Sequence, residues 1–242
     1  MKIFPITYKR FGEKAILIEW EKRVDESILN DIIDFKDKII DSELLSLNDL
    51  VVGYHSLTLI FKKELNNYEQ LLEVLEKVRV EGIASKRKEK VLWKIPVCYE
   101  IKFGIDLEEM FASKDMSIEN IVKLHTDTVY TVFFIGFLPG FLYLGGLDKI
   151  LHTNRKANPR LKVAKGSIAI GGSQTGVYPM ESPGGWNIIG RTPISFFDMN
   201  KTNPCFAKPG DRLQFYPITE HEYIEIQKEL VSNDYKLKKE LL

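Results

Sequence analysis

From Thr128 onward the chain is a series of short apolar segments separated by glycine and proline. The segments are TVYTVFFIG, GSIAIGG, GVYPM, WNIIG, PISFFD and DRLQFYPI. Apolar runs of this length are typical of β-strands, and turn residues recur between them at close intervals. This part of the sequence therefore predicts a β-barrel or a closed β-sandwich.

The residues before that point alternate between strand and helix patterns. Four segments read as strands, namely AILIEW, DLVVGYH, SLTLIF and VLWKIPVCY. Between them, DESILNDIIDFKDKII and NYEQLLEVLEKVRV place apolar side chains at helical spacing. The order strand, helix, strand, strand, helix, strand is typical of ferredoxin-like domains. We therefore expect an α+β protein, with a small ferredoxin-like α/β domain over residues 1–98 and a β-barrel domain with a C-terminal helix over residues 99–242.

Two helix starts have the spacing of a capping box, in which two side chains satisfy backbone N–H groups at the first turn. Asp106 and Glu109 stand at the start of DLEEMFASK, and Thr219 and Glu222 open the amphipathic segment at the end of the chain. We expect Asp106 and Thr219 to act as the N-caps of these two helices.

The composition argues against two classes of partner. The 242 residues contain 34 Lys and Arg and 34 Asp and Glu, so the formal net charge is zero. A nucleic-acid binder or a protein held on an anionic membrane needs a basic surface, and we expect neither partner. No apolar run approaches the roughly 20 residues that a bilayer span requires. Because MKIFPITYKRFGEK also lacks the apolar core of a signal peptide, we expect a cytoplasmic protein.

Several familiar catalytic motifs do not occur in the sequence. There is no G-x-x-x-x-G-K-[ST] loop for ATP, and GGSQT is one glycine short of the G-x-S-x-G elbow of serine hydrolases. The segment from His221 to Glu225 has a glutamate where the H-E-x-x-H zinc motif has its second histidine. We expect no metal site. Cys98 and Cys205 are interpreted either as small buried hydrophobic residues or as a disulfide.

Two glycine- and proline-rich segments are the strongest candidates for a binding site. Residues 136–146, GFLPGFLYLGG, combine tight backbone with large apolar side chains. Residues 171–193 contain six glycines, three prolines, a tryptophan and an arginine. Glycine lets a ligand approach the backbone, whose N–H groups can then face an oxyanion or a carboxylate. The alternative is that these glycines only turn the corners of a barrel that the aromatic side chains fill.

Polar side chains in or near these segments are suited to an anionic ligand. Arg191 has a planar fork that matches a carboxylate or phosphate, unless it pairs with Glu181. Gln174 and Thr175 can hydrogen-bond an amide or carboxylate, and Tyr178 offers a hydroxyl. The predicted substrate-binding residues are Gly140, Phe141, Tyr143, Arg160, Gln174, Thr175, Tyr178, Pro183, Gly184, Gly185 and Arg191.

Other residues leave two interpretations open. Trp186 either fills the core or stacks on substrate, and Arg155 and Arg160 either contact an anion or lie in a solvated loop. His125, at the end of a predicted helix, either acts as an acid or base near neutral pH or caps that helix at its C-terminus. His125 and Glu181 are the predicted catalytic residues, each as a candidate general base.

Taken in order, these segments resemble a known family. The similar segments are FGEKAILIEW, GYHSLTLIF, IPVCYE followed by FGIDLEEM, YTVFFIGFLPGFLYLGGL, NPRLKVAKGSIAI, GGSQTGVYPMESPGGWNIIGRTP and PGDRLQFYPI. They are similar to the KipI / PxpB family, also called allophanate hydrolase subunit 1. The resemblance covers nearly the whole chain. It implies a small N-terminal α/β domain followed by a cyclophilin-like β-barrel.

The resemblance also implies a function. Most members look like the B component of a bacterial ATP-dependent 5-oxoprolinase, which opens 5-oxo-L-proline to L-glutamate. That complex includes a PxpA-like lactam-utilisation subunit and a PxpC-like (KipA-like) second cyclophilin-like subunit, so we expect a hydrolase site shared with a partner barrel. Because no nucleotide motif is visible here, we expect ATP to be bound elsewhere in the complex. The alternative is a KipI-type inhibitor of a sensor histidine kinase, and a peptidyl-prolyl isomerase ranks last because a shared fold does not transfer activity.

Overall fold

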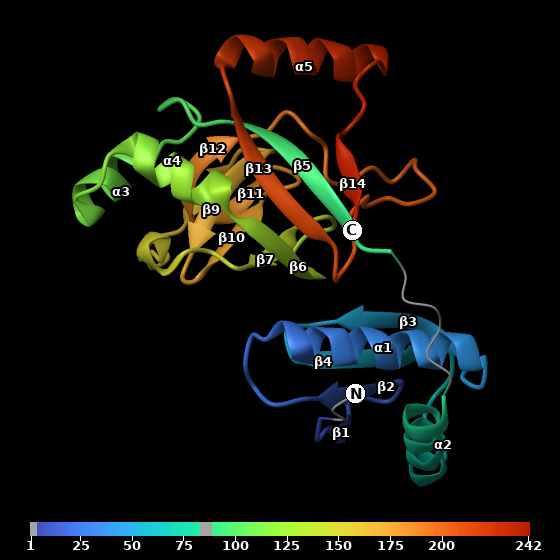
Figure 1. Cartoon of the computed structure of the whole chain (residues 1–242). Coiled ribbons are helices and arrows are strands. Elements are labelled where there is room, and N and C mark those ends of the chain that lie inside the picture. Colours follow the sequence, from blue (N-terminus) through green and yellow to red (C-terminus); the bar gives the residue numbers. More distant parts are fainter. Residues whose placement is uncertain (1–3, 83–88) are drawn as a thin grey trace. The chain divides into compact units, whose positions relative to one another are not determined.

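The computed structural model describes residues 4–82 and 89–242. It divides into two compact units, and the division falls between Glu89 and Lys90 (Figure 1). The predicted boundary after residue 98 is therefore wrong by one strand. β5 (Val91–Cys98) pairs in parallel with β13 (Arg212–Ile218) of the second unit and does not complete the sheet of the first. An apolar run predicts a strand, but it does not predict which sheet that strand joins.

The first unit is a four-stranded antiparallel sheet with two helices. Its elements are β1 (Thr7–Arg10), β2 (Ala15–Glu19), α1 (Glu26–Ser42), β3 (Leu47–Val52), β4 (Ser56–Phe61) and α2 (Tyr68–Glu81). The strands neighbour one another in the order β1-β2-β4-β3, and α1 runs along this sheet in Figure 1. The N-terminal strand β1 takes the edge beside β2 that the last strand of a ferredoxin-like domain would occupy. This edge is already paired, so β5 belongs to the other unit.

The second unit is built on a closed ring of seven strands. In the order in which they neighbour one another, the strands are β12 (Asn187–Arg191), β9 (Ser167–Gly171), β10 (Gln174–Val177), β7 (Leu142–Gly145), β6 (Val129–Ile135), β13 and β5. The ring closes where Arg191 of β12 pairs with Cys98 of β5. The predicted α+β fold, with a small N-terminal unit followed by a β-barrel, is confirmed.

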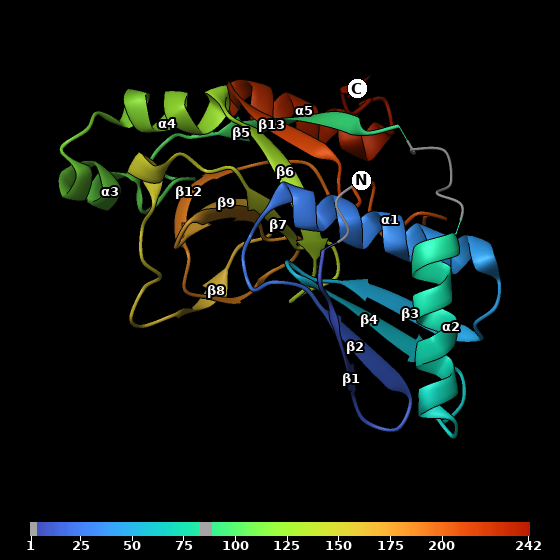
Figure 2. The same ribbon diagram turned by 60° about the horizontal axis from the view of Figure 1, so that its bottom comes forward.

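Shorter elements lie around this barrel. They are α3 (Leu107–Lys114), α4 (Ile118–Asp127), the 3-10 turn η1 (Lys149–Leu151), β8 (Arg160–Val163), β11 (Ser182–Gly184), α5 (Glu220–Ser232) and β14 (Lys239–Leu241). β8 and β11 form a separate antiparallel two-stranded sheet, and β14 extends the barrel sheet beside β5. Figure 2 shows β8 apart from the barrel strand β9. The predicted strand PISFFD does not form, and residues 193–198 are irregular chain. The segment starts at a proline, which has no backbone N–H to donate to a neighbouring strand.

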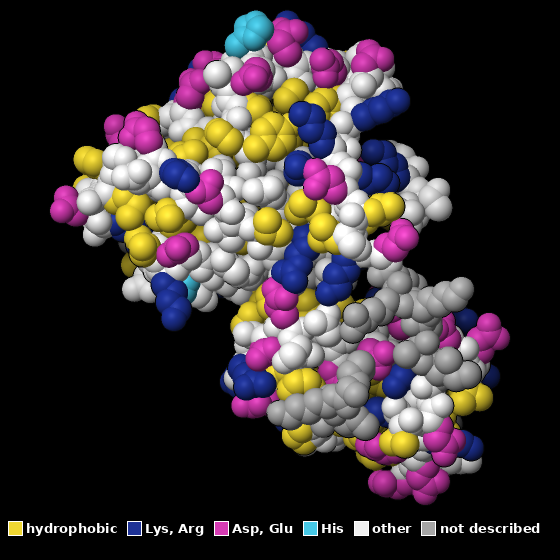
Figure 3. Space-filling view, viewed as in Figure 1, with side chains coloured by type: hydrophobic (Ala, Val, Ile, Leu, Met, Phe, Trp, Pro, Cys, Tyr) yellow, Lys and Arg dark blue, Asp and Glu magenta, His cyan; other side chains and the backbone are white. Residues whose placement is uncertain are grey.

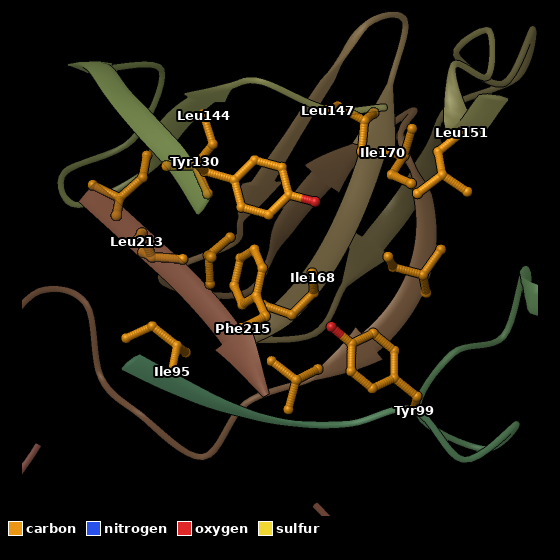
Figure 4. Close-up of a cluster of buried hydrophobic side chains, with 14 of the residues drawn as sticks. Ile95, Tyr99, Tyr130, Leu144, Leu147, Leu151, Ile168, Ile170, Leu213 and Phe215 are labelled. Atoms are coloured by element: carbon orange, nitrogen blue, oxygen red, sulfur yellow. The ribbon is translucent and has the colours of Figure 1, made fainter. Parts of the chain in front are cut away.

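The inside of the barrel is apolar, and Figure 4 shows its side chains converging from opposite strands. Leu142 and Leu144 of β7 point into this core, whereas Tyr143 between them packs in a second cluster. Ile168 and Ile170 of β9 likewise point inward, and Ala169 lies in the second cluster. Because successive residues of a strand face opposite sides of the sheet, the same strands supply the barrel core and the outer surface.

The capping box at Thr219 is confirmed. The Thr219 hydroxyl accepts a hydrogen bond from the Glu222 backbone N–H, and the Glu222 carboxylate accepts one from the Thr219 N–H. Asp106 stands at the start of α3 but makes no side-chain cap, so that prediction is wrong. Its carboxylate is used elsewhere, as described below.

The surface charge and the two cysteines can be compared with what the composition predicts. On the face shown in Figure 3, acidic and basic side chains are interspersed, with hydrophobic side chains between them. Within residues 4–82 and 89–242, no helix combines the length and the apolar character needed to cross a bilayer. Cys98 and Cys205 are both free thiols, so the disulfide alternative is wrong and Cys98 is a buried core residue.

Candidate functional site

Most of the predicted binding residues gather on the outside of the barrel around one tryptophan. A buried cluster of Phe141, Val163, Ala169, Tyr178, Trp186 and Ile188 lies there, with Tyr143 packed against it. We call Tyr143, Arg155, Arg160, Tyr178 and Trp186 the Trp186 face. Two hollows of about 400 and 330 Å³ lie elsewhere, around Gln214 and around Leu71.

Two glycines form the floor on which Trp186 rests. A Cβ atom added to Gly171 of β9 would lie 2.5 Å from atoms of the indole ring, and one added to Gly176 of β10 would lie 3.1 Å from it. Side chains at these positions would push Trp186 off the sheet, so glycine is needed for this close approach. Trp186 is 5% exposed. Of the two interpretations of this residue, filling the core and stacking on substrate, its burial favours the first.

Gly184 and Gly185 precede Trp186 and differ in how closely other atoms approach them. Neither has a positive φ, so backbone conformation does not require glycine at these two positions. A Cβ at Gly184 would lie 2.2 Å from the Tyr178 hydroxyl oxygen, and this close contact accounts for the glycine. At Gly185 the nearest atom would be 3.5 Å away, which is an ordinary contact. Gly140 does need its special conformation, with φ of 83° at the turn before Phe141.

A Gly171→Ala substitution is expected to destabilise the second unit by about 1–3 kcal/mol, because the indole must move to admit the new methyl group. The near-ultraviolet circular dichroism of the tryptophans should change as well. Gly185→Ala, one residue from Trp186, is the matched control and should leave both the spectrum and the unfolding midpoint close to wild type. Equal behaviour of the two variants in urea unfolding would contradict the close packing described here.

The aromatic rings of the Trp186 face pack edge to face. The Phe141 ring lies 5.6 Å from Trp186 and 5.2 Å from Tyr178, each at nearly a right angle. The Tyr143 ring lies 6.0 Å from Trp186 and stacks on Phe134 at 4.2 Å. Such contacts fix ring positions more closely than aliphatic packing does. Tyr143 is only half-buried, so it forms an apolar edge that a ligand can reach.

Two guanidinium groups border these rings. The Cζ atom of Arg155 lies 5.5 Å from the centre of the Trp186 ring, a cation–π geometry. Burial raises the pKa of Tyr143 and of Tyr178 above 10.0, and the positive charge of Arg155 opposes both shifts. Arg160 opposes the shift at Tyr178 as well. Arg155 therefore adds positive potential at both tyrosine hydroxyls, and Arg160 adds to it at Tyr178.

Asp106 anchors this cationic segment, although the sequence offered no signal for that role. It is 2% exposed, and its Oδ1 accepts a hydrogen bond from Arg160 Nη2 at 2.5 Å and lies 3.1 Å from Lys156 Nζ. Its Oδ2 accepts from the backbone N–H of Ile188 at 2.6 Å, and the Asp106 N–H donates back to the Ile188 carbonyl at 2.9 Å. Lys156 also pairs with the exposed Glu109. One buried carboxylate thus joins the start of α3, β12 and the segment that carries Arg155.

His125 and Thr175 lie inside the barrel, away from the Trp186 face. The Tyr99 hydroxyl is 2.7 Å from His125 Nδ1, and His125 Nε2 is 2.9 Å from the Thr175 hydroxyl. Thr175 donates its own proton to the Ala169 carbonyl at 3.1 Å. The Thr175 oxygen must therefore accept from Nε2–H, and Nδ1 accepts from Tyr99. Figure 4 shows Tyr99 and Phe215 in this core, and the His125 ring stacks on Phe215 at 4.7 Å.

The surroundings of His125 do not fit either predicted role. The side chain is fully buried, and burial lowers its pKa from 6.5 to about 3. It is therefore neutral at physiological pH, and both ring nitrogens are engaged in the core. It can neither reach a ligand on the outside of the barrel nor stabilise the C-terminus of α4 as a cation.

Arg191 and Glu181 lie apart from each other. Glu181 pairs with Lys162 at 3.3 Å, so the predicted alternative of a Glu181–Arg191 pair is wrong. Arg191 stands five positions beyond Trp186, about 16 Å along an extended strand. Burial raises the pKa of Tyr223 on α5, and the charge of Arg191 opposes that rise. Arg191 thus lies toward α5, at the place where β12 closes onto β5.

The remaining predicted residues can be placed from strand geometry. Gln174 and Gly176 are two positions apart on β10, so both face outward when Thr175 between them faces the core. Gln174 is half-buried and pairs with Gly171 in the floor under Trp186. Pro183 is exposed on β11, opposite β8. The structure therefore brings Gln174, Tyr143, Tyr178 and Arg160 to one outer surface of the barrel. Thr175 and His125 lie inside the barrel, and Arg191 lies toward α5.

The chain belongs to the family described as carboxyltransferase domain, subdomain C and D, whose model matches residues 6–207. It is similar to the B component of 5-oxoprolinase from Escherichia coli O157:H7, with 36% identity over 209 residues, 86% of this chain and 94% of that protein. It is also similar to the B component of 5-oxoprolinase from Bacillus subtilis strain 168, with 31% identity over 226 residues, 89% of this chain and 94% of that protein. The family resemblance drawn from the sequence is confirmed.

Solved structures show the same fold within longer chains. TTHA0988 is 29% identical with a TM-score of 0.75, and the match covers 85% of this chain and 40% of that one. The Kluyveromyces lactis urea amidolyase is 21% identical with a TM-score of 0.81, covering 99% of this chain and 16% of that one. This chain therefore spans less than half the length of either structural relative.

Proposed function

We propose that this chain is the B component of a 5-oxoprolinase and supplies one wall of a site that opens 5-oxo-L-proline to L-glutamate. The observation that carries the proposal is the similarity, over 86–89% of this chain, to proteins named as the B component of 5-oxoprolinase. The name of those relatives does not favour the kinase-inhibitor alternative. The Trp186 face supports the proposal, because it combines apolar rings with positive charge on an accessible surface.

The proposed chemistry explains why such a wall is useful. A lactam amide is a poor electrophile, so we propose that ATP phosphorylates its carbonyl oxygen and leaves as ADP. Water then attacks the ring carbon, the C–N bond breaks to free the amine, and hydrolysis of the resulting acyl phosphate releases phosphate and L-glutamate. The substrate carboxylate and the anionic oxygens that form in this sequence need cationic or N–H donors around them. On this chain, we propose that Arg155 and Gln174 provide them.

The rest of the site is proposed to come from other subunits. We propose a PxpC-like second barrel and a PxpA-like subunit as partners, with ATP held outside this chain because its sequence has no P-loop. The long relatives are consistent with this arrangement, since their similar regions are joined to further sequence in one chain. Of the two predicted catalytic residues, only Glu181 has an exposed side chain, and it remains the candidate base on this chain.

The test is glutamate release from 5-oxo-L-proline and ATP by this chain mixed with PxpA-like and PxpC-like subunits from the same source. We expect activity only when all three are present and none from this chain alone. Omitting this chain should reduce turnover to background. Undiminished activity without it, or full activity of the chain by itself, would contradict the proposal.

A further inference from the structure

We infer that Arg155 is the residue that binds the carboxylate of the substrate, in place of the arginine on β12 that the sequence favours. This inference rests on the proposed function and names the anion-binding group within the same site. It draws on three independent features of the segment from Asn154 to Lys156, namely its backbone hydrogen bonds, its unpaired charge and its aromatic surroundings.

The backbone on both sides of Arg155 is fixed opposite Trp186. The Asn187 side chain donates to the Asn154 carbonyl at 2.9 Å, and the Lys156 N–H donates to the Gly185 carbonyl at 2.7 Å. Residues 154 and 156 are thus bonded to residues 187 and 185, which places Arg155 directly across from Trp186. The buried Asp106 carboxylate holds the same segment through Lys156 and Arg160. The backbone that carries the exposed Arg155 is therefore ordered before any ligand binds, which lowers the entropic cost of binding.

The charge of Arg155 is not neutralised by a neighbour. Within the described residues, no carboxylate lies within 4.0 Å of its guanidinium, whereas Lys156, Arg160 and Lys162 each pair with an acidic side chain. The guanidinium Cζ lies over the Trp186 ring at 5.5 Å from its centre, and the N–H donors of an arginine lie in the plane of its fork. A planar fork supported on an aromatic ring is suited to bidentate binding of a carboxylate.

The surroundings select a small ligand with one anionic group and one apolar side. Tyr143 borders Trp186 and stacks on Phe134, so a half-buried aromatic edge lies next to the cation. The Nη1 atom of Arg160 is buried and makes no hydrogen bond among the described residues, so one donor of this guanidinium is left without an acceptor although its charge pairs with Asp106. A five-membered lactam with a carboxylate matches this pairing of charge and apolar edge. The same lactam without its carboxylate would lose the charged contact alone.

The experiment compares Arg155→Gln and Arg155→Lys with wild type in the assembled complex. One hydrogen bond to a charged group contributes about 1.5–3 kcal/mol, and the glutamine amide can keep one of the two bonds, so Arg155→Gln should raise KM for 5-oxo-L-proline roughly 10–150-fold with a smaller change in kcat. The KM of Arg155→Lys should lie between those of wild type and Arg155→Gln. Inhibition by 2-pyrrolidinone, which has no carboxylate, should be the same in all three proteins. Lys165→Gln removes another exposed cation of the second unit and should match wild type.

A second readout separates failure of this inference from failure of the proposed function. The ¹⁵N indole resonance of Trp186 should shift when 5-oxo-L-proline is added to the wild-type complex and should shift less with 2-pyrrolidinone. In Arg155→Gln the two compounds should give the same small response. If the complex is inactive but Trp186 still responds to the carboxylate, the anion site stands and the substrate assignment fails. If the complex is active and Arg155→Gln has wild-type KM and an unchanged Trp186 response, the inference is wrong.

Discussion

Replacing Asp106 with alanine is expected to destabilise the second unit by about 3–5 kcal/mol, the usual effect of removing one partner of a buried charge pair. The physical reason is that this one carboxylate accepts hydrogen bonds from Arg160 and from the Ile188 N–H and lies 3.1 Å from Lys156 Nζ. Without it, the Arg160 guanidinium and a backbone N–H lose their acceptor in a site with little access to water. The measurement is the unfolding free energy from urea titration, followed by circular dichroism and by tryptophan fluorescence.

Two further variants separate the roles of charge and shape at this position. Asp106→Asn keeps an oxygen that can accept from the Ile188 N–H but loses the charge, so its effect should be smaller than that of alanine. Glu109→Gln removes the exposed carboxylate that pairs with Lys156, and such surface pairs contribute about 0–1 kcal/mol. A loss below about 1 kcal/mol in Asp106→Ala would contradict the anchoring role assigned to this residue.

The anchor also connects stability to the proposed site. Asp106 holds the segment that carries Arg155, and the same segment is tied to Gly185 and Asn187 on either side of Trp186. Loss of the carboxylate should therefore loosen Arg155 as well as lower stability. We expect Asp106→Asn, assayed at a temperature where it remains folded, to raise KM for 5-oxo-L-proline more than Glu109→Gln does.

The second large effect is expected at acid pH and comes from His125. Its pKa is lowered from 6.5 to about 3 in the folded protein because the ring is buried. Above pH 6.5 the histidine is neutral in both the folded and unfolded states, so it contributes no pH dependence. Below that pH the unfolded state takes up a proton that the folded state does not. Stability should then fall by about 1.4 kcal/mol per pH unit, or roughly 3 kcal/mol by about pH 4 from this residue alone.

His125→Gln isolates this contribution from that of the carboxylates. Glutamine does not titrate, and its amide can still accept from Tyr99 and donate to Thr175. Between about pH 6.5 and 4, the unfolding free energy of this variant should decline less steeply with falling pH than that of wild type. The two slopes should differ by up to about 1.4 kcal/mol per pH unit, the contribution of one proton. His221→Gln, which removes an exposed histidine on α5, should keep the wild-type slope. Parallel pH profiles for wild type and His125→Gln would show that the buried histidine is not the acid-sensitive group.

The family and the fold were accessible from sequence because both depend on local patterns. The alternation within β7 and β9 places Leu142, Leu144, Ile168 and Ile170 on one side of each strand, and glycine and proline mark the turns between strands. Such patterns depend on neighbours one or two residues away, so they can be read without a structure. The segments from Gly136 to Pro193 were specific enough to identify the family.

Other features could not be predicted, because they depend on contacts between residues far apart in sequence. The run at 91–98 is unmistakably a strand, but its pairing with β13 decides the domain boundary. Asp106 has the spacing of a helix cap, yet its strongest backbone contact is with Ile188, 82 residues later. His125 ends a helix in the sequence, but Tyr99 and Thr175 enclose it in the barrel.

The proposed choice of Arg155 as the anion-binding arginine also separates what local sequence predicts from what distant contacts decide. By itself the sequence determined that this chain folds as an α/β unit followed by a glycine-rich barrel, and that cations accompany the glycines. Only the tertiary structure decided which cation lies over Trp186 and which neighbouring cations pair with the buried Asp106 carboxylate. The reason is physical: strand alternation and turn formation are set by adjacent residues, whereas burial, ion pairing and the electrostatic field at a site depend on every segment that folds against it.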